Sequence, residues 1–376
     1  MIGIIQAFEP NEYGHGGSKR SAQLLEILSE NWNLNNITVI DFKYKGSVTN
    51  KFKRTLSGFL SAKNIIKESG YSFTFKKYYK EIYKIAAAIN HLKSQEQIIH
   101  SCKIIIWEST QDYWWFIPWL LQKKYNKKLI CIPHNLESLV SSQEITIFNT
   151  KSQKWIEEEA HLISKGEVTF TISDEESWLL SFWGIKAYWL PYFPTSSVEN
   201  ELLEIRKKRE NLSKTNKDNN FFLILGTAGN RPTRLGMESL IRFIEKSNNL
   251  DKFNFVIAGF DTEKYFKSNK SNFAVEGTIS NERLNEILLS TSGLIINQIP
   301  TSGQICKIME FLLAGIPVIC NQQAARSYKI YDIIDFNRLE ELPYILSNKT
   351  TIPDKPVKPL KQINNFINII QEYMIS

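Results

Sequence analysis

A lysine and a glutamate that could bind a nucleotide lie in the segment from Pro300 to Pro317, PTSGQICKIMEFLLAGIP, directly after an apolar strand-like run. Gly303 permits close approach of the backbone, and the N–H groups of a helix start favour an anion. Lys307 adds a positive charge about one turn into the predicted helix, and Glu310 shares its face. A diphosphate would fit beside Lys307, and Glu310 can accept hydrogen bonds from a ribose diol. The competing interpretation is a surface ion pair on an ordinary helix.

Two N-terminal segments carry further candidate residues. The glycine-rich loop NEYGHGGSKR, residues 11–20, follows the first apolar run and opens a predicted helix. Backbone N–H groups at Gly16 and Gly17 could face a diphosphate or an acceptor. The loop lacks the G-x-G-x-x-G spacing of a dinucleotide site, which disfavours NAD. His134 ends the run KKLICIP, where a role at a site and an ordinary structural histidine both stay open.

The elements that must position these residues follow from an alternation of short β-branched runs with amphipathic stretches. One series extends from IGIIQA at residues 2–7 to AYWLPY at 187–192, and a second from FFLILG at 221–226 to IPVICN at 316–321. This alternation is typical of parallel strands covered by helices, so we expect an α/β protein with functional loops after the strands. The expected parts are a Rossmann-like domain over 1–193, a polar linker over 194–220, a second Rossmann-like domain over 221–355, and a C-terminal helix over 356–376 that can pack back toward the first domain.

Composition narrows the class of protein. With 376 residues, 43% hydrophobic and 23% charged, the chain can bury two globular cores. The four cysteines are far apart and form no CxxC pair, which indicates reduced thiols in a cytoplasmic protein. The first residues indicate a strand rather than a signal peptide, and no apolar run approaches the ~20 residues that span a bilayer. The net charge of +7 indicates an anionic partner.

The segment that begins at Gly303 has a wider resemblance. Its pattern G-x-I-x-K-x-x-E-x-x-x-x-G-x-P-V-I resembles the nucleotide-sugar motif of GT-B glycosyltransferases, particularly the retaining family 4. Segments in the same order agree over nearly the whole chain, namely PHNLES (133–138), WIEEEAHLISKGEVTFTISDEES (155–177), LGTAGNRPTRLGMESLIRFIE (225–245) and the stretch 253–297. The resemblance implies two Rossmann-like domains facing across a cleft. It also implies retaining transfer of a sugar from a nucleoside diphosphate sugar to a saccharide or lipid-linked acceptor, without metal or cofactor, in surface polysaccharide or glycolipid synthesis.

The resemblance also implies roles for individual residues. Lys307, with Arg231 or Arg234, would neutralise the diphosphate leaving group, which a metal does in other transferases. His134 would position the donor sugar and stabilise charge. The departing phosphate would accept the acceptor proton, so the protein would supply orientation and electrostatics. The residues implied to bind the donor nucleotide sugar are Gly16, Gly17, Gly226, Gly259, Thr278, Ser302, Gly303, Gln304, Ile305 and Glu310.

One stretch departs from the family pattern. Many members carry a second glutamate seven residues before the ribose-binding one, whereas this chain has no carboxylate from Thr301 to Gln304. The backbone amides of Gln304 and Ile305, or the Ser302 hydroxyl, would then hold the sugar, whose identity stays open. Two alternatives remain for the whole chain: a sugar-nucleotide-binding pseudo-enzyme or scaffold, and a sugar-nucleotide epimerase on the same fold.

Residues 43–84 are strongly basic, with eleven Lys or Arg against two acids, and are interleaved with Phe and Tyr. Such a stretch could rest on an anionic bilayer, which would make the protein peripheral at the inner face of the membrane. An ordinary amphipathic helix pair with solvated lysines is the alternative. Because no RNP, zinc or helix-turn-helix signature accompanies the stretch, we do not expect nucleic acid as a partner.

Overall fold

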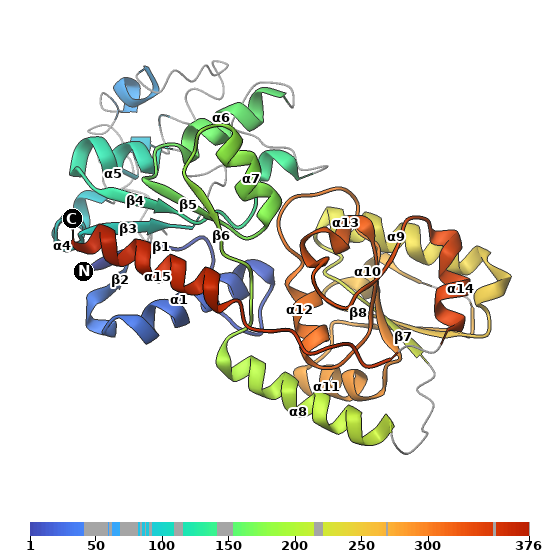
Figure 1. The fold of residues 1–376 in the computed structure, drawn as a ribbon. Helices are drawn as coiled ribbons and strands as arrows, with labels where there is room; N and C mark the ends of the chain where they lie inside the picture. The colour runs from blue at the N-terminus through green and yellow to red at the C-terminus, as the bar shows by residue number, and fades with distance from the viewer. Residues whose placement is uncertain are drawn as a thin grey trace. The chain divides into compact units, whose positions relative to one another are not determined.

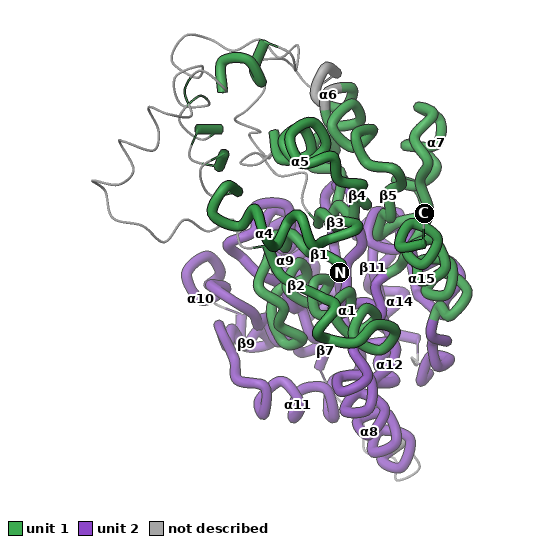
Figure 2. Tube along the Cα trace, turned by 90° about the vertical axis from the view of Figure 1, so that its left-hand side faces the viewer, with its two compact units in different colours: residues 1–139, 144–191, 359–376 green, residues 140–143, 192–358 purple. Residues whose placement is uncertain are grey.

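The computed structural model describes residues 1–40, 92–108, 116–140, 153–213, 221–267, 270–348 and 351–375, with separate helical residues between 59 and 89. The chain forms two compact units, coloured separately in Figure 2. Unit 1 comprises residues 1–139, 144–191 and 359–376, and unit 2 comprises residues 140–143 and 192–358. Most of the basic stretch 43–84 lies outside the described residues, so its membrane interpretation stays a prediction.

Unit 1 is built on a parallel six-stranded sheet with the order β2-β1-β3-β4-β5-β6 (Figure 1). Its strands are β1 (Ile2–Ile5), β2 (Ile37–Val39), β3 (Ile104–Trp107), β4 (Lys128–Cys131), β5 (Val168–Thr171) and β6 (Ala187–Trp189). Each lies inside an apolar run that predicted a strand. All residues of β1, β3 and β5 are buried, as expected for parallel strands that are covered on both faces.

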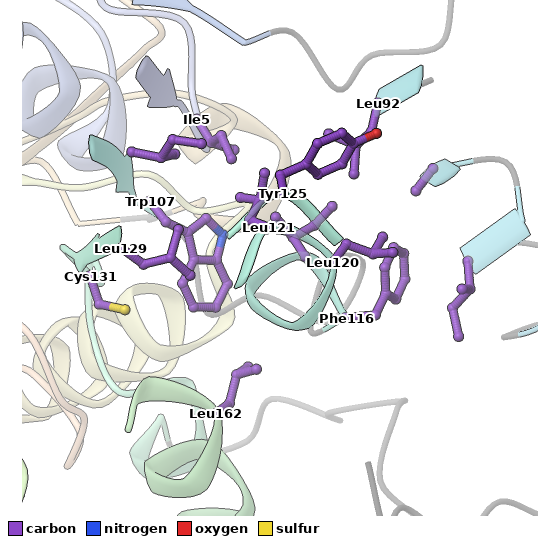
Figure 3. Packing of buried hydrophobic residues seen from close by; sticks show 14 of the residues in the cluster. Ile5, Leu92, Trp107, Phe116, Leu120, Leu121, Tyr125, Leu129, Cys131 and Leu162 are labelled. Carbon is purple, nitrogen blue, oxygen red and sulfur yellow. The ribbon is translucent and has the colours of Figure 1, made fainter. Parts of the chain in front are cut away.

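Two hydrophobic clusters cover the two faces of this sheet. Successive residues of β3 alternate between them, because side chains of a strand point to opposite faces. Ile105 and Trp107 join the cluster that includes α5 (Ile117–Tyr125), and Figure 3 shows Trp107 near Leu129 and Leu121. The opposite cluster is formed with α1 (Gly16–Asn31) and α15 (Leu360–Ile375). Further helices among the described residues of unit 1 are α4 (Glu96–Ser101), α6 (Gln153–Ile163), α7 (Asp174–Phe182), and the 3-10 turns η1 (Leu34–Asn36) and η2 (Glu137–Leu139).

The C-terminal helix α15 belongs to the core of unit 1. Phe366 of α15 is fully buried and meets Phe170 of β5 edge to face, with ring centroids 4.8 Å apart. Ile363, Ile369 and Ile370 pack into the same cluster. The last residues of the chain therefore complete a sheet face that the first residues begin.

Unit 2 repeats the architecture with a parallel six-stranded sheet of order β12-β11-β10-β7-β8-β9. Its strands are β7 (Phe221–Leu225), β8 (Asn254–Ala258), β9 (Phe273–Gly277), β10 (Gly293–Ile296), β11 (Val318–Asn321) and β12 (Ile334–Phe336). The edge strand β12 was not predicted, because only one of its three residues is buried and no apolar run marks it. The helices are α8 (Ser196–Ser213), α9 (Arg231–Lys246), α10 (Thr262–Tyr265), α11 (Asn281–Ser290), α12 (Cys306–Leu313), α13 (Gln322–Ala325) and α14 (Leu342–Ser347), with the 3-10 turns η3 (Asn248–Leu250), η4 (Arg326–Tyr328) and η5 (Leu339–Glu341).

The expected linker 194–220 needs a correction, because it contains the 18-residue helix α8, which belongs to unit 2. The boundary between the units lies earlier, between Pro191 and Tyr192. Two arginines of α8 look solvated in the sequence but bond to helix ends. Arg206 donates to the carbonyl of Leu312 at 2.9 Å, and the buried Arg209 donates to the carbonyl of Leu288 at 2.6 Å. Both carbonyls lie in the last turn of a helix, where no partner exists within the helix itself.

Within the described residues, none of the helices combines the length and the apolar character needed to cross a membrane.

Candidate functional site

Most of the predicted nucleotide residues of unit 2 follow β7 or β10, two strands that lie side by side, whereas Gly259 and Thr278 follow β8 and β9. β7 has β8 on one side and β10 on the other: the chain first adds strands on the β8 side and later adds β10 on the opposite side of β7. The position between β7 and β10 is therefore the topological switch point of the sheet. Ligands of parallel α/β sheets bind at such points, outside the carboxyl ends of the strands. The loop after β7 leads into α9, and the loop after β10 leads into α12.

Lys307 connects these two loops. It lies on α12, yet its Nζ donates a hydrogen bond of 2.6 Å to the carbonyl oxygen of Leu225, the last residue of β7. The ammonium is therefore held at the carboxyl end of a central strand. Ile305, the N-cap residue of α12, makes no side-chain capping bond. The cation and the partial positive charge of a helix start thus come together at one point, which suits an anion.

Glu310 lies one turn further along α12, and its carboxylate is held by a tyrosine. The hydroxyl of Tyr192 donates to Glu310 Oε1 at 2.7 Å, and the exposed fractions of the two residues are 1% and 8%. Burial, and then the negative charge of Glu310, raise the pKa of Tyr192. The phenol therefore stays protonated and acts as the hydrogen-bond donor to Glu310. Tyr192 was not predicted as a site residue, because it ends the run AYWLPY and looks like a strand residue in the sequence.

The loop before α12 is fixed from two sides. Gly303 has φ +78°, a left-handed conformation that favours glycine, and the Arg326 guanidinium donates to its carbonyl. The Tyr328 hydroxyl donates to the carbonyl of Ile305 at 2.7 Å. Gln304 Oε1 accepts the backbone N–H of Tyr192 at 2.9 Å. A donor-sugar contact from Gln304 would therefore come from its backbone or its amide NH₂, and this contact stays a prediction.

The two candidate arginines lie in the first turn of α9 but differ in their surroundings. Arg234 is half-buried, with its guanidinium carbon 4.5 Å from the ring centroid of Tyr265 and an ion pair of 3.7 Å to Glu238. Arg231 is exposed at the first position of the helix. The structure thus offers one ordered and one exposed arginine after β7.

Two glycines predicted to contact the donor have a packing role. Gly259 has φ +121°, and a Cβ there would lie 2.0 Å from the carbonyl oxygen of Gly226. A Cβ on Gly226 would in turn lie 2.5 Å from the sulfur of Met237 in α9. The loops after β7 and β8 can therefore pass each other only with glycine at these positions. The Thr278 hydroxyl oxygen accepts a hydrogen bond from the backbone N–H of Asp261 at 3.3 Å. Contacts of Gly226, Gly259 and Thr278 with a donor sugar nucleotide stay predictions.

Unit 1 has its own switch point, between β1 and β3, and a buried carboxylate lies there. Glu108 directly follows β3 and is 1% exposed. Its Oε2 accepts the hydroxyl of Ser21 at 2.5 Å and the backbone N–H of Ala7 at 3.4 Å, and it lies 3.5 Å from Nε2 of His134. His134 was a predicted site residue but Glu108 was not, since an acidic residue after a strand has no distinctive local signal.

Several polar atoms near this pair are buried without a hydrogen-bond partner among the described residues. They are Oε1 of Glu108, both ring nitrogens of His134, and Nε2 of Gln6, which follows β1. An unsatisfied buried polar group costs about 1–3 kcal/mol, so such a cluster is unusual in a merely structural core. This geometry does not fit the interpretation of His134 as a structural histidine satisfied by hydrogen bonds.

Phe8 contacts both the glycine-rich loop and the same histidine. The Phe8 ring meets His134 edge to face at 5.1 Å and His15 at 4.6 Å between centroids. A Cβ on Gly17 would lie 2.4 Å from the Phe8 ring, so glycine lets α1 begin close to it. His15 caps α1 by accepting the N–H of Ser18, and burial, with the nearby His134, lowers its pKa. The structure thus brings Gly16, Gly17 and His134 to one end of the unit 1 sheet.

No three His, Cys, Asp or Glu side chains among the described residues are grouped as a metal site requires. The four cysteines are buried and none of them is in a disulfide, and burial raises the pKa of Cys131 and of Cys320 to about 12. These two thiols are therefore poor nucleophiles at neutral pH.

No family model and no curated protein matches the chain, but solved structures do. A UDP-forming α,α-trehalose-phosphate synthase from Burkholderia vietnamiensis superposes with a TM-score of 0.61 at 9% identity, over 100% of this chain and 98% of that chain. A sucrose-phosphate synthase from Thermosynechococcus elongatus gives 0.59 at 11% identity, over 92% and 88%. Anabaena HepE in complex with UDP and glucose gives 0.56 at 11% identity, over 92% and 88%. These neighbours are GT-B glycosyltransferases, so the prediction of the GT-B fold is confirmed.

Proposed function

We propose that this chain is a glycosyltransferase that transfers a sugar from a nucleoside diphosphate sugar to a saccharide or lipid-linked acceptor. The observation that carries the proposal is the position of Lys307. Its ammonium donates a hydrogen bond to the carbonyl oxygen of Leu225, at the end of β7 and at the switch point of unit 2. Glu310 follows about one turn later on the same helix. A cation suited to a diphosphate and a carboxylate suited to a ribose diol thus lie about one turn apart on one helix.

The chemistry proposed for unit 2 is stabilisation of the leaving group. As the bond between the sugar and the diphosphate breaks, negative charge grows on the diphosphate, and preorganised positive groups stabilise it in the transition state. Lys307, the start of α12 and one of the two arginines of α9 would supply this charge. Of the two, we favour Arg234, since its stacking on Tyr265 and its ion pair with Glu238 hold the guanidinium in place.

The proposed role of unit 1 is to bind the acceptor and to orient His134. Hydroxyl groups of an acceptor would bond to the polar atoms of Gln6, Glu108 and His134 that have no hydrogen-bond partner in the described part of the chain. These three residues follow three neighbouring strands. A retaining outcome, in which the departing phosphate takes the acceptor proton, is part of the proposal. The proposal also includes membership of family 4, independence of metal ions, and a place in surface polysaccharide or glycolipid synthesis at the inner face of a membrane.

UDP-sugars are the first donors to test, because one neighbour is UDP-forming and another holds UDP and glucose. The purified protein is incubated with a panel of UDP-, GDP- and ADP-sugars, with and without EDTA and with oligosaccharide or lipid-linked acceptors. We expect release of nucleoside diphosphate that persists in EDTA and increases with an acceptor. Lys307→Ala should lower kcat/KM by about 10²- to 10³-fold, whereas Lys246→Ala, at the exposed far end of α9, should leave it unchanged.

Other outcomes distinguish the alternatives. Nucleotide binding without turnover on any acceptor would indicate a pseudo-enzyme or scaffold, and turnover to an epimeric sugar nucleotide without an acceptor would indicate an epimerase. Absence of both binding and turnover across the donor panel would refute the proposal.

A further inference from the structure

The residue with which the long segment 192–358 of unit 2 begins contacts α12, the helix that carries Lys307 and Glu310. Tyr192 is the first residue after the boundary between the units, and it makes two bonds to the segment around α12. Its hydroxyl donates to Glu310 Oε1 at 2.7 Å, and its backbone N–H donates to Gln304 Oε1 at 2.9 Å. One tyrosine therefore holds both a carboxylate of the helix and the loop that leads into it.

The environment of this contact favours a fixed geometry. Tyr192 is 1% exposed and Glu310 is 8% exposed, so bulk water competes little with the hydrogen bond between them. A hydrogen bond to a charged acceptor is stronger than a neutral one, and a low local dielectric strengthens it further. Because a carboxylate can accept about four hydrogen bonds, the bond from Tyr192 leaves Glu310 able to accept others.

The backbone that leads into Tyr192 is also anchored. In unit 1, the buried Arg20 donates to the carbonyl of Leu190 at 2.7 Å, and Gln23 donates to the carbonyl of Pro191 at 3.0 Å. Pro191 itself has a restricted φ. Tyr192 thus follows two residues whose carbonyls are held by α1, and its own side chain and N–H are held by unit 2.

We propose that Tyr192 is a positioning residue for ribose recognition: its phenol turns the Glu310 carboxylate toward the 2′- and 3′-hydroxyls of the bound nucleotide. This inference rests on the proposed function and names a group that acts through Glu310 rather than on the substrate. Fixing the carboxylate before binding removes the cost of ordering it, which preferentially strengthens binding of ligands that carry the ribose diol.

The test compares ligands that differ only in the groups Glu310 would bind. Affinities of the full-length protein are measured by calorimetry for UDP, 2′-deoxy-UDP, 3′-deoxy-UDP and inorganic pyrophosphate, and GDP or ADP with their deoxy forms replace UDP if they bind more tightly. Losing a hydrogen bond to a charged group costs a factor of about ten to a hundred, so the wild type should prefer UDP over the deoxy forms by that factor.

Tyr192→Phe keeps the ring and removes only the hydroxyl. We expect UDP affinity to fall about tenfold, affinity for the deoxy forms to fall less, and pyrophosphate binding to stay unchanged, because pyrophosphate has no ribose. In a Glu310→Gln background, Tyr192→Phe should have little further effect on the preference for ribose, because residues that act through one contact are not additive.

Tyr328→Phe is the matched control. Tyr328 is also buried, but its hydroxyl donates to the backbone carbonyl of Ile305 rather than to a carboxylate. Its loss should weaken UDP, the deoxy forms and pyrophosphate in the same proportion and leave the preference for ribose intact.

The outcomes separate this inference from the proposed function. If the wild type prefers UDP over its deoxy forms and Tyr192→Phe keeps that preference, the role of Tyr192 is refuted while the proposed function stands. The same conclusion follows if Tyr192→Phe weakens pyrophosphate as much as UDP. If the wild type binds no nucleoside diphosphate, both proposals are wrong.

Discussion

Replacement of Glu108 by glutamine tests whether the buried pair in unit 1 takes part in the reaction. Glutamine has the size of glutamate, and its amide oxygen can still accept the Ser21 hydroxyl and the Ala7 N–H, which now bond to Oε2 at 2.5 and 3.4 Å. The change removes the negative charge that lies 3.5 Å from Nε2 of His134. The imidazole would then lose the electrostatic attraction through which this charge can orient it.

The two effects of the substitution have different sizes. Stability should change by less than about 1 kcal/mol, because the hydrogen bonds are kept and a buried charge with a high desolvation cost is removed. Loss of the group that orients a functional histidine typically costs about 10- to 100-fold in activity, and we expect kcat to fall by that factor. Glu108→Ala should instead lower stability by about 2–4 kcal/mol, because the buried Ser21 hydroxyl and Ala7 N–H lose their acceptor.

The assay is release of nucleoside diphosphate in the presence of an acceptor, measured beside the urea-unfolding free energy of each variant. Glu30→Gln, on the exposed end of α1, is the control for a glutamate substitution in the same unit. Combined with His134→Ala, Glu108→Gln should cost little further activity, because the carboxylate would act through the histidine. A Glu108→Gln enzyme with wild-type kcat and KM would refute this reasoning.

Two further predictions concern the residues that support the proposed nucleotide site. Gly259→Ala should destabilise the protein by more than about 3 kcal/mol, because φ is +121° and the Cβ would lie 2.0 Å from the carbonyl oxygen of Gly226. The measurement is the urea-unfolding midpoint, which should fall, or the yield of soluble protein. A variant as stable as the wild type would contradict the packing described for the loops after β7 and β8. Arg209→Ala should lower the unfolding free energy by about 2–4 kcal/mol, because it removes the hydrogen-bond donor to the carbonyls of Gly315 and Leu288. As a control, substitution of the exposed Lys208 by alanine should lower it by under about 0.5 kcal/mol. Equal stability of the two variants would mean that Arg209 contributes no more than a surface charge.

Local patterns in the sequence determined the class of fold. Strands such as β3 and β10 are buried on both faces, so their residues form continuous apolar runs that can be recognised without a structure. The order of loops after strands follows from the same alternation. The spacing of Lys307 and Glu310 on one helix face is also local, because three residues in a helix nearly complete a turn.

The tertiary structure decided which groups hold these residues. Tyr192 and Glu310 are separated by 118 positions, and Ser21 and Glu108 by 87, so no local pattern predicts either contact. The helix α8 was misread as a linker for a related reason, since Arg206 and Arg209 look solvated until the ends of α11 and α12 are placed beside them. Periodicity reports which face of an element is buried, whereas hydrogen-bond partners depend on which strands become neighbours in a sheet. The sequence alone therefore determined where a nucleotide-type site is expected, after β10, and only the folded chain decided that Tyr192 bonds to the carboxylate of Glu310 and that Glu108 lies beside His134.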